Sequence, residues 1–431
     1  MKSSLLVFAA IFVATYILLA FSQEFHIRKR APLAWISTII LVILSGTPLK
    51  EIPEAINWNV LGIFLGMLPL AEFFSASGVP EHMAVSIADR VKSAGLAIVW
   101  LAALSGIISV FVENVATVLI LAPIAKELAK RLKVPLTPIM VAVAISSNLQ
   151  GTATLVGDPP SMLLAAFYRM NFLDFFFFKG RISIFWAVEA GALLSLAVLY
   201  LIFKKYKQHP PFMKPNPVRS YFPTVILVLT VLLLSSVSFF DPDFKFGAGI
   251  ITLFMGIVIT LWALKRKETT FGEVVSKVID WDTFFLLMAI FVMVHTAVKA
   301  GLIDAFAKLI YSSLKGNVFM TYTVLVWSSV LASAFIDNVP YVAAMLPITR
   351  ELAILYGNPD YGYLFAFGVL IGACLGGNIT PVGAAANITA MSIVREEGEN
   401  PSFWDFFKIG FPFTMAATFG GYIVTYLAWG V

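Results

Sequence analysis

The sequence predicts an all-α protein that crosses a membrane many times and is built from two inverted repeats. Three observations lead to this prediction. Of 431 residues, 59% are hydrophobic and 13% are charged, with a mean hydropathy of +0.89, whereas soluble domains carry about 25% charged residues. Apolar runs of about 20 residues, the length needed to span a bilayer, recur along the chain. One polar motif occurs once in each half of the chain.

The predicted spans follow the apolar runs in chain order. Eight uninterrupted runs predict one membrane helix each: 3–22, 31–48, 58–77, 183–203, 221–239, 246–264, 281–300 and 408–429. The first run is long for a signal peptide, lacks a small-residue cleavage site and precedes three basic residues, so we expect it to be retained. Two more regions, 136–168 and 362–394, are interrupted by QGTATLVGDPP and GGNITPVGAAAN, and these interruptions predict broken helices.

The repeated motif places a carboxylate beside an asparagine inside an apolar stretch. FVENVATVLILAPIAKEL and FIDNVPYVAAMLPITREL share eight of eighteen positions, and their acid–amide pairs are Glu113–Asn114 and Asp337–Asn338. A charge at the centre of a membrane helix costs about 2.5–3.5 kcal/mol, so two such insertions indicate a function. The surrounding regions are too long for one helix. They predict two re-entrant hairpins with the polar pairs at their tips, facing a cavity; two full helix pairs are the alternative.

The repeat extends over most of the chain. The segments INWN…SASG and IDWD…VKAG correspond at an offset of 223, the hairpin motifs at 224, and LQGTATLVG and LGGNITPVG at 226. This small drift is typical of duplication followed by short loop insertions. We therefore predict a first repeat at 1–203, a cationic, proline-rich linker at 204–220 and a second repeat at 221–431. Five spans and one hairpin in each repeat would orient the two repeats oppositely.

The distribution of cations predicts the orientation of the chain in the membrane. On the hairpin topology, 20 of the 30 Lys and Arg residues fall on one face, among them Arg28, Lys29 and Arg30. Cytoplasmic loops are enriched in Lys and Arg, so this face is predicted to be cytoplasmic and both termini to be outside. We expect a multi-pass protein of the plasma (inner) membrane. The net charge of +5 is explained by these loops and does not indicate nucleic acid as a partner.

Broken helices and polar residues near the midplane are the general design of secondary transporters. Carbonyl groups at a helix break can replace the water around a cation, half-helix N-termini attract anions, and a carboxylate can bind a proton or sodium. We predict one asymmetric substrate and ion site where the hairpin tips and helix breaks meet. Its predicted residues are Glu113, Asn114, Asn148, Gly151, Thr152, Thr154, Gly157, Asp158, Asp337, Asn338, Gly377, Asn378, Thr380, Gly383 and Asn387.

Several of these residues also have structural interpretations. The glycine-rich breaks are compatible with close helix packing, and asparagines with hydrogen bonds between helices. Asp158, which precedes two prolines, either binds a ligand or only caps a half-helix. Glu72 and His295 occupy matching positions in the repeat and are candidates for a proton relay, or else are packed between helices.

The sequence also argues against other classes of protein. No catalytic constellation is visible, and the motif GxxxxGK[ST] is absent, so we expect neither an enzyme nor an ATP-driven pump. Four scattered histidines and one cysteine predict no metal cluster and no cofactor. Sodium is the one bound ion that we expect, at Asn114, Asn338 and the adjacent backbone.

Four motifs, FVENVATVLILAP, SNLQGTATLVGDPPS, FIDNVPYVAAMLP and GACLGGNITPVGAAANI, stand in the chain in this order. In them the chain resembles the ion transporter superfamily, specifically the branch of arsenite permeases, NhaD-type sodium/proton antiporters and the P protein. The resemblance covers essentially the whole chain. It implies a homodimer of inverted-repeat protomers, each with a scaffold domain and a transport domain that moves by an elevator mechanism.

The superfamily also includes sodium-coupled citrate and dicarboxylate carriers, which typically carry Ser-Asn-Thr at both tips. This chain has Glu-Asn-Val and Asp-Asn-Val instead, and these acids would repel a carboxylate substrate. We therefore expect a secondary transporter coupled to protons or sodium, with efflux of an arsenite-like oxyacid favoured over sodium/proton antiport, and citrate or dicarboxylate symport third. A gated ion channel is the alternative from another class.

Overall fold

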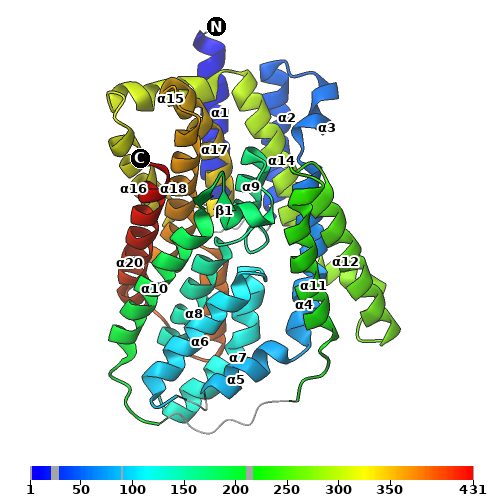
Figure 1. The fold of residues 1–431 in the computed structure, drawn as a ribbon, viewed down its shortest axis with the longest axis vertical. Helices are drawn as coiled ribbons and strands as arrows, with labels where there is room; N and C mark the ends of the chain where they lie inside the picture. Colours follow the sequence, from blue (N-terminus) through cyan, green and yellow to red (C-terminus); the bar gives the residue numbers. More distant parts are fainter. Residues whose placement is uncertain (1, 21–28, 89–90, 210–216, 431) are drawn as a thin grey trace.

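The computed structural model describes residues 2–20, 29–88, 91–209 and 217–430, which are almost entirely helical (Figure 1). The α-helices of the first half are α1 (Lys2–Ala20), α2 (Arg30–Ser45), α3 (Ile52–Ala55), α4 (Trp58–Ala76), α5 (Val79–Ala88), α6 (Ala94–Ser109), α7 (Asn114–Leu132), α8 (Leu136–Gly151), α9 (Pro159–Tyr168) and α10 (Ile184–Phe203). Those of the second half are α11 (Phe222–Ser236), α12 (Gly247–Lys265), α13 (Phe271–Glu273), α14 (Trp281–Lys299), α15 (Leu302–Ser313), α16 (Val318–Ser333), α17 (Asn338–Leu355), α18 (Asp360–Gly376), α19 (Ala385–Glu396) and α20 (Phe403–Trp429).

The remaining elements are short. They are the 3₁₀ turns η1 (Leu49–Glu51), η2 (Phe172–Phe175), η3 (Val237–Phe239) and η5 (Gly377–Ile379), the π turn η4 (Val274–Val278), and the strands β1 (Phe177–Phe178) and β2 (Arg181–Ile182). The two strands pair antiparallel, with Phe177 opposite Ile182.

Each apolar run predicted to span the membrane forms a helix, with bounds within five residues of the prediction wherever the run is described. In the described part of the chain, six helices are long and apolar enough to cross a bilayer: α4, α10, α11 with η3, α12, α14 and α18 with η5. Helices α2, α6, α8 and α16 and the stretch Leu5–Leu19 of α1 are apolar but shorter. The chain is therefore a polytopic integral membrane protein. The last two residues of the predicted run 3–22 and the linker residues Pro210, Pro211 and Pro215 lie outside the described residues, as does Arg28.

Both acid–amide motifs lie at a break between two helices. Helix α6 ends at Ser109 and α7 begins at Asn114, and the Glu113 carboxylate accepts hydrogen bonds from the N–H groups of Val115 (3.0 Å) and Ala116 (3.1 Å). Asp337 caps α17 in the same way, accepting from the N–H of Val339 at 3.0 Å. The first N–H groups of a helix have no partner within it, so a carboxylate at this position stabilises the helix start.

Figure 1 places α6 and α7 in the lower part of the molecule and α15 and α17 in the upper part. The starts of α7 and α17 nevertheless line one cavity. The hairpins α6–α7 and α16–α17 therefore approach the same point from opposite ends of the molecule.

The two glycine-rich regions break their helices where the sequence predicts. Helix α8 ends at Gly151 and α9 restarts at Pro159, a residue suited to a first helical turn because its missing N–H would have no partner there. In the second half α18 ends at Gly376 and α19 begins at Ala385. Each break is tied to its own hairpin by an equivalent bond: Thr154 Oγ1 donates to the carbonyl of Val110, and Thr380 Oγ1 to that of Ala334.

Helices α5 and α15 were not predicted. Each follows a glycine with positive φ, Gly78 at +76° and Gly301 at +75°, and these two glycines mark the end of the first matching segment of the repeat. Such a φ is strained for residues with a Cβ, so glycine permits the turn. Both helices contain charged residues and are shorter than a membrane span, which is why a search for long apolar runs passes over them.

The contacts between the halves are reciprocal. Helix α2 packs on α14 while its counterpart α12 packs on α4, α7 meets α19 while α17 meets α9, and α10 packs along its own counterpart α20. The crossing of α4 and α12 is close because Gly66 faces the backbone of Thr252, where a Cβ would overlap it. Small residues allow such backbone contact in membrane helices.

The described ends of the linker are hydrogen-bonded to the first half of the chain. The N–H groups of Ala94 and Gly95 donate to the carbonyls of Gln208 (2.8 Å) and Tyr206 (2.9 Å), and the N–H of Arg219 donates to Ser77 (2.9 Å). In Figure 1 the end of α10 lies at the bottom, whereas α1 begins at the top and α20 ends in the upper half. The termini and the linker are thus at opposite ends of the molecule.

Candidate functional site

A cavity of about 330 Å³ lies where the two hairpin tips meet the two helix breaks. Its wall is formed by the starts of α7, α9, α14, α17 and α19, by one side of α4, and by single residues of α2, α8 and η4. Seven of the predicted residues line it: Glu72, Glu113, Asn114, Asn148, Asp158, Asp337 and Asn338. Because these residues come from both halves, the structure brings the two repeated motifs into one site.

The other predicted residues do not line this cavity. Those of the helix breaks are Gly151, Thr152, Thr154, Gly157, Gly377, Asn378, Thr380, Gly383 and Asn387; the tenth, His295, is described below. Asn387 donates to the carbonyls of Gly377 (2.9 Å) and Thr380 (3.1 Å), and so holds the second break in shape. A Cβ on Gly151 would overlap the amide oxygen of Asn114, so this glycine leaves room for the first tip. Asn387 and Gly151 thus support the geometry of the site without lining it.

A chain of amides connects the first tip to both breaks. Ser109 Oγ donates to Asn114 Oδ1 (2.7 Å), and Asn114 Nδ2 donates to Asn148 Oδ1 (3.1 Å). Asn148 Nδ2 in turn donates to Asn378 Oδ1 (3.0 Å) and to the carbonyl of Cys374 (2.8 Å). All these side chains are buried, and a buried polar network of this kind fixes the relative positions of the helices that it joins.

Asp158 stands at the capping position of α9, but its side chain accepts no hydrogen bond from the start of that helix. The carboxylate is buried, with 5% of the residue exposed, and lies 3.5 Å from Nδ2 of Asn338 on the opposite tip. Simple helix capping therefore does not account for this residue. Its counterpart in the second half is Ala384, which also lines the cavity, so the site is asymmetric.

Three charged residues that the sequence analysis did not assign to the site also belong to it. Asp280 lines the cavity, accepts from the N–H of Thr283 (3.0 Å) and caps α14. Arg30 lines it as well, and its guanidinium donates to Asp337, while Asp282 holds the backbone N–H of Arg30 at 3.0 Å. Arg30, which the sequence analysis counted among the loop cations, begins α2 and contributes its side chain to this cavity. The acidic residues of the segment IDWD were the sequence signal from which this side of the cavity could have been predicted.

The cavity is strongly acidic. Its described lining contains five carboxylates and, as the only cation, Arg30, which is already engaged with Asp337. The carboxylates are Glu72, Glu113, Asp158, Asp280 and Asp337. Such a lining favours protons, metal cations and hydrogen-bond donors, and it disfavours anions.

Glu72 and His295 lie in two different cavities. Glu72 lines the acidic cavity, whereas His295 lines a second cavity, of about 410 Å³, between α14 and the helices α9 and α17. Leu68, Ala71 and Glu72 of the first cavity match Phe291, Val294 and His295 of the second at the repeat offset of 223. The two residues are thus not brought together as one relay; each occupies the equivalent position in its own cavity.

His295 has a different carboxylate neighbour. Its Nε2 lies 3.3 Å from Oε2 of Glu51, which also accepts from Lys299 Nζ at 2.6 Å. The hydrogen bond from Lys299 and then that from His295 lower the pKa of Glu51, which lies in the connection between α2 and α4. Glu51 is therefore ionised at neutral pH.

The multi-pass fold and the polar cavity between broken helices define a membrane transporter. Residues 16–366 match the family described as Citrate transporter (CitMHS), and the chain belongs to this family. It is 28% identical to the "46 kDa membrane protein" of Mycobacterium leprae, over 94% of each chain. It is 27% identical to an uncharacterized transporter of Synechocystis, over 92% of this chain and 91% of that protein.

Two further likenesses extend the comparison. The human P protein is 23% identical over 94% of this chain, which spans 57% of that longer protein. The crystal structure of the YdaH transporter of Alcanivorax borkumensis has the same fold, with a TM-score of 0.63 and 13% identity over 99% of this chain and 98% of that one. Together these findings confirm the superfamily that the four motifs indicated.

Proposed function

We propose that the chain is a secondary active transporter that uses a proton or sodium gradient to export a small inorganic solute, with an uncharged, arsenite-like oxyacid as the favoured cargo. The observation that carries this proposal is the cavity lined by five carboxylates and one engaged arginine. Ionised carboxylates only accept hydrogen bonds, and the hydroxyl groups of an oxyacid are donors. Protonation of a carboxylate would remove an acceptor and release the cargo, so proton binding and cargo binding compete.

The same lining argues against citrate, although the family carries that name. Each pair of like charges at 4 Å repels by about 4 kcal/mol near a protein surface, and a citrate ion would approach several carboxylates at once. Arg30 could compensate only by leaving Asp337. We therefore rank citrate or dicarboxylate symport below the other two functions.

Sodium/proton antiport is the second candidate, and Asp158 favours it. This buried carboxylate accepts a long hydrogen bond from Asn338 and forms no ion pair among the described residues. An uncompensated buried charge is costly, and either a sodium ion or a proton would neutralise it. Asn114 and Asn338 place amide groups beside the same cavity.

An alternating-access mechanism, in which the site opens first to one side of the membrane and then to the other, fits the arrangement of the helices. The reciprocal contacts between the halves and the matching walls that α4 and α14 contribute to the two cavities support an inverted repeat. In this proposal the tightly packed helices α2, α4, α12 and α14 are a scaffold, and the hairpins with the broken helices move against it as an elevator. The functional unit is a homodimer in the inner membrane, with both termini outside and the linker in the cytoplasm.

The test is transport by the purified protein in liposomes that contain a pH-sensitive dye. Sodium, lithium, arsenite, silicate, phosphate and citrate are added in turn under a proton gradient or a sodium gradient. We expect saturable, gradient-dependent movement of one small cargo, together with counterflow exchange. A conductance without an exchange phase would show a channel, and gradient-driven citrate uptake without movement of any other solute would overturn the choice of cargo.

A further inference from the structure

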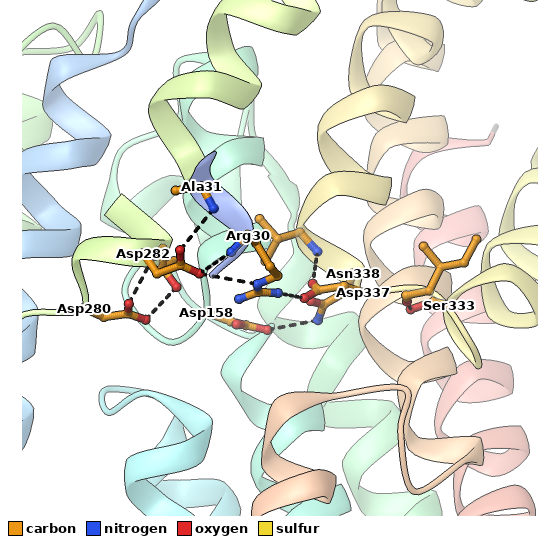
Figure 2. A network of polar contacts seen from close by, with 11 residues as sticks. Arg30, Ala31, Asp158, Asp280, Asp282, Ser333, Asp337 and Asn338 are labelled. Atoms are coloured by element: carbon orange, nitrogen blue, oxygen red, sulfur yellow. Dashed lines mark hydrogen bonds and ion pairs between the residues drawn. The ribbon is translucent and has the colours of Figure 1, made fainter. Parts of the chain in front are cut away.

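The two hairpin tips carry corresponding acids with different partners. Asp337 of the second tip forms an ion pair with the guanidinium of Arg30, and both side chains are about one quarter exposed, at 25% and 27%. Figure 2 shows Arg30 between Asp282 and Asp337, with Asp158 and Asn338 alongside. Among the described residues, Glu113 of the first tip takes part in no ion pair and is held only by backbone N–H groups.

Arg30 is held in place by the scaffold. Asp282 accepts from the N–H groups of Arg30 (3.0 Å) and Ala31 (3.1 Å), and its Oδ2 lies 3.8 Å from the guanidinium Nε. The start of α2 is therefore fixed to α14. The guanidinium points from this corner to the tip of the second hairpin (Figure 2).

The corresponding corner in the other half also has a side chain that holds a helix start, but among the described residues no cation stands there. Asn59, which matches Asp282 at the offset of 223, accepts from the N–H of Gly249 at 2.6 Å and so holds the start of α12. The first three residues of α12 are Gly247, Ala248 and Gly249. The nearest basic residue before them in the chain, Lys245, pairs with Asp243 at 3.0 Å. The duplication has thus kept the helix start and placed an arginine at only one of the two tips.

We infer that Arg30 is a fixed counter-ion that withdraws Asp337 from ion exchange and thereby sets how many coupling ions accompany each cargo. An arginine side chain does not lose its proton in proteins, so Asp337 keeps a permanent internal cation. Glu113 and Asp158 are then the carboxylates that exchange protons or sodium. This inference rests on the proposed function. In it, Arg30 determines the number of ions that are coupled to each cargo.

The test compares Arg30→Gln, Arg30→Lys and the double variant Arg30→Gln/Asp337→Asn in liposomes. The membrane potential at which coupled flux reverses gives the number of ions moved per cargo. We expect Arg30→Gln to raise this number by one, because Asp337 then takes up a coupling ion. The double variant and Arg30→Lys should return to the wild-type number. Active transport by Arg30→Gln with an unchanged number would overturn the inference.

A second measurement does not depend on transport. Proton uptake by the purified protein in detergent is followed while the pH is lowered stepwise. Arg30→Gln should take up about one proton per chain more than the double variant. The wild type should take up no more protons than the double variant. If Arg30→Gln shows no additional proton, the inference is wrong whether or not the variant transports. If the wild type shows no coupled flux with any cargo, the proposed function fails while proton uptake still reports on Arg30.

Discussion

The hairpins α6–α7 and α16–α17 are built alike and are placed in different electrostatic surroundings. Both break for four residues, both start their second helix with an acid at the cap, and both receive a threonine hydroxyl from the neighbouring helix break. Yet the acid of one tip is paired with Arg30, and that of the other, among the described residues, contacts only backbone N–H groups. The two hairpins thus share one backbone frame, and single side chains beside it make the difference between a paired acid and an unpaired one.

The largest effect should follow from Asp158→Asn, because this carboxylate exists in only one half and has no capping role. We expect coupled flux to fall about 100-fold or more, equivalent to about 2.7 kcal/mol, while the thermal unfolding temperature changes little. The matched control is Glu127→Gln, which removes a carboxylate from the exposed side of α7. Equal flux in Asp158→Asn and wild type would remove this residue from the site.

Gly151→Ala tests whether the break must leave room for the tip. The new methyl group would overlap Asn114, and overpacking costs up to about 3 kcal/mol. We expect a lower unfolding temperature in detergent and weak transport. Gly272→Ala is the control, since a Cβ there meets open space. A Gly151→Ala protein as stable and as active as this control would show that the amide network around Asn114 is dispensable.

Because each helix break is bonded to its hairpin in the same way, removing the bond in either half should lower the unfolding free energy by the same amount. Thr154→Val and Thr380→Val each remove the hydroxyl that joins a break to its hairpin, and each leaves a buried carbonyl without that donor. We expect each variant to lose about 2 kcal/mol of unfolding free energy. Thermal unfolding in detergent provides the measurement. If one variant is destabilised and the other is not, the two tie points are not equivalent.

The smallest effect concerns a difference between the starts of α8 and α18. The carboxylate of Glu399 accepts from the N–H groups of Leu136 (2.6 Å) and Thr137 (3.0 Å) at the start of α8, whereas at the start of α18 the uncharged amide oxygen of Asn358 accepts from the N–H of Asp360 (3.0 Å). Burial opposes ionisation of Glu399, but these bonds and that from the Thr137 hydroxyl prevail and lower its pKa. A lowered pKa means that the stabilisation is present above the unfolded-state pKa of about 4.3 and is lost as the pH falls through the folded-state value.

Glu399→Gln should therefore cost about 1 kcal/mol at pH 7 and progressively less as the medium becomes more acidic. Unfolding temperatures of wild type and variant, compared from pH 7 down to about pH 2, test this, because the loss falls below the unfolded-state pKa. A difference that stays constant over this range would mean that the charge of Glu399 contributes nothing to the start of α8.

The sequence allowed much of the fold to be predicted because its strongest signals are local. Runs of apolar residues, the acids before α7 and α17, and the glycine-rich breaks each determine structure through nearby backbone groups. Helices α5 and α15 were missed because they are short and mixed in polarity. In the site, Glu113, Asp158 and Asp337 were foreseen as costly charges in apolar runs. Arg30 and Asp280 were not, because their roles depend on a contact between halves that no spacing along the chain reveals.

The most direct test of the account compares Glu113→Gln with Asp337→Asn in one assay, cargo-driven proton or sodium movement in liposomes. Both variants keep a side-chain acceptor for the helix start. Because Glu113 is one of the two exchanging acids, the account predicts that Glu113→Gln moves one ion fewer per cargo than the wild type. It predicts that Asp337→Asn, whose acid is already neutralised by Arg30, weakens transport but keeps the wild-type number of ions per cargo. An unchanged number in Glu113→Gln, or a lower number only in Asp337→Asn, would contradict it.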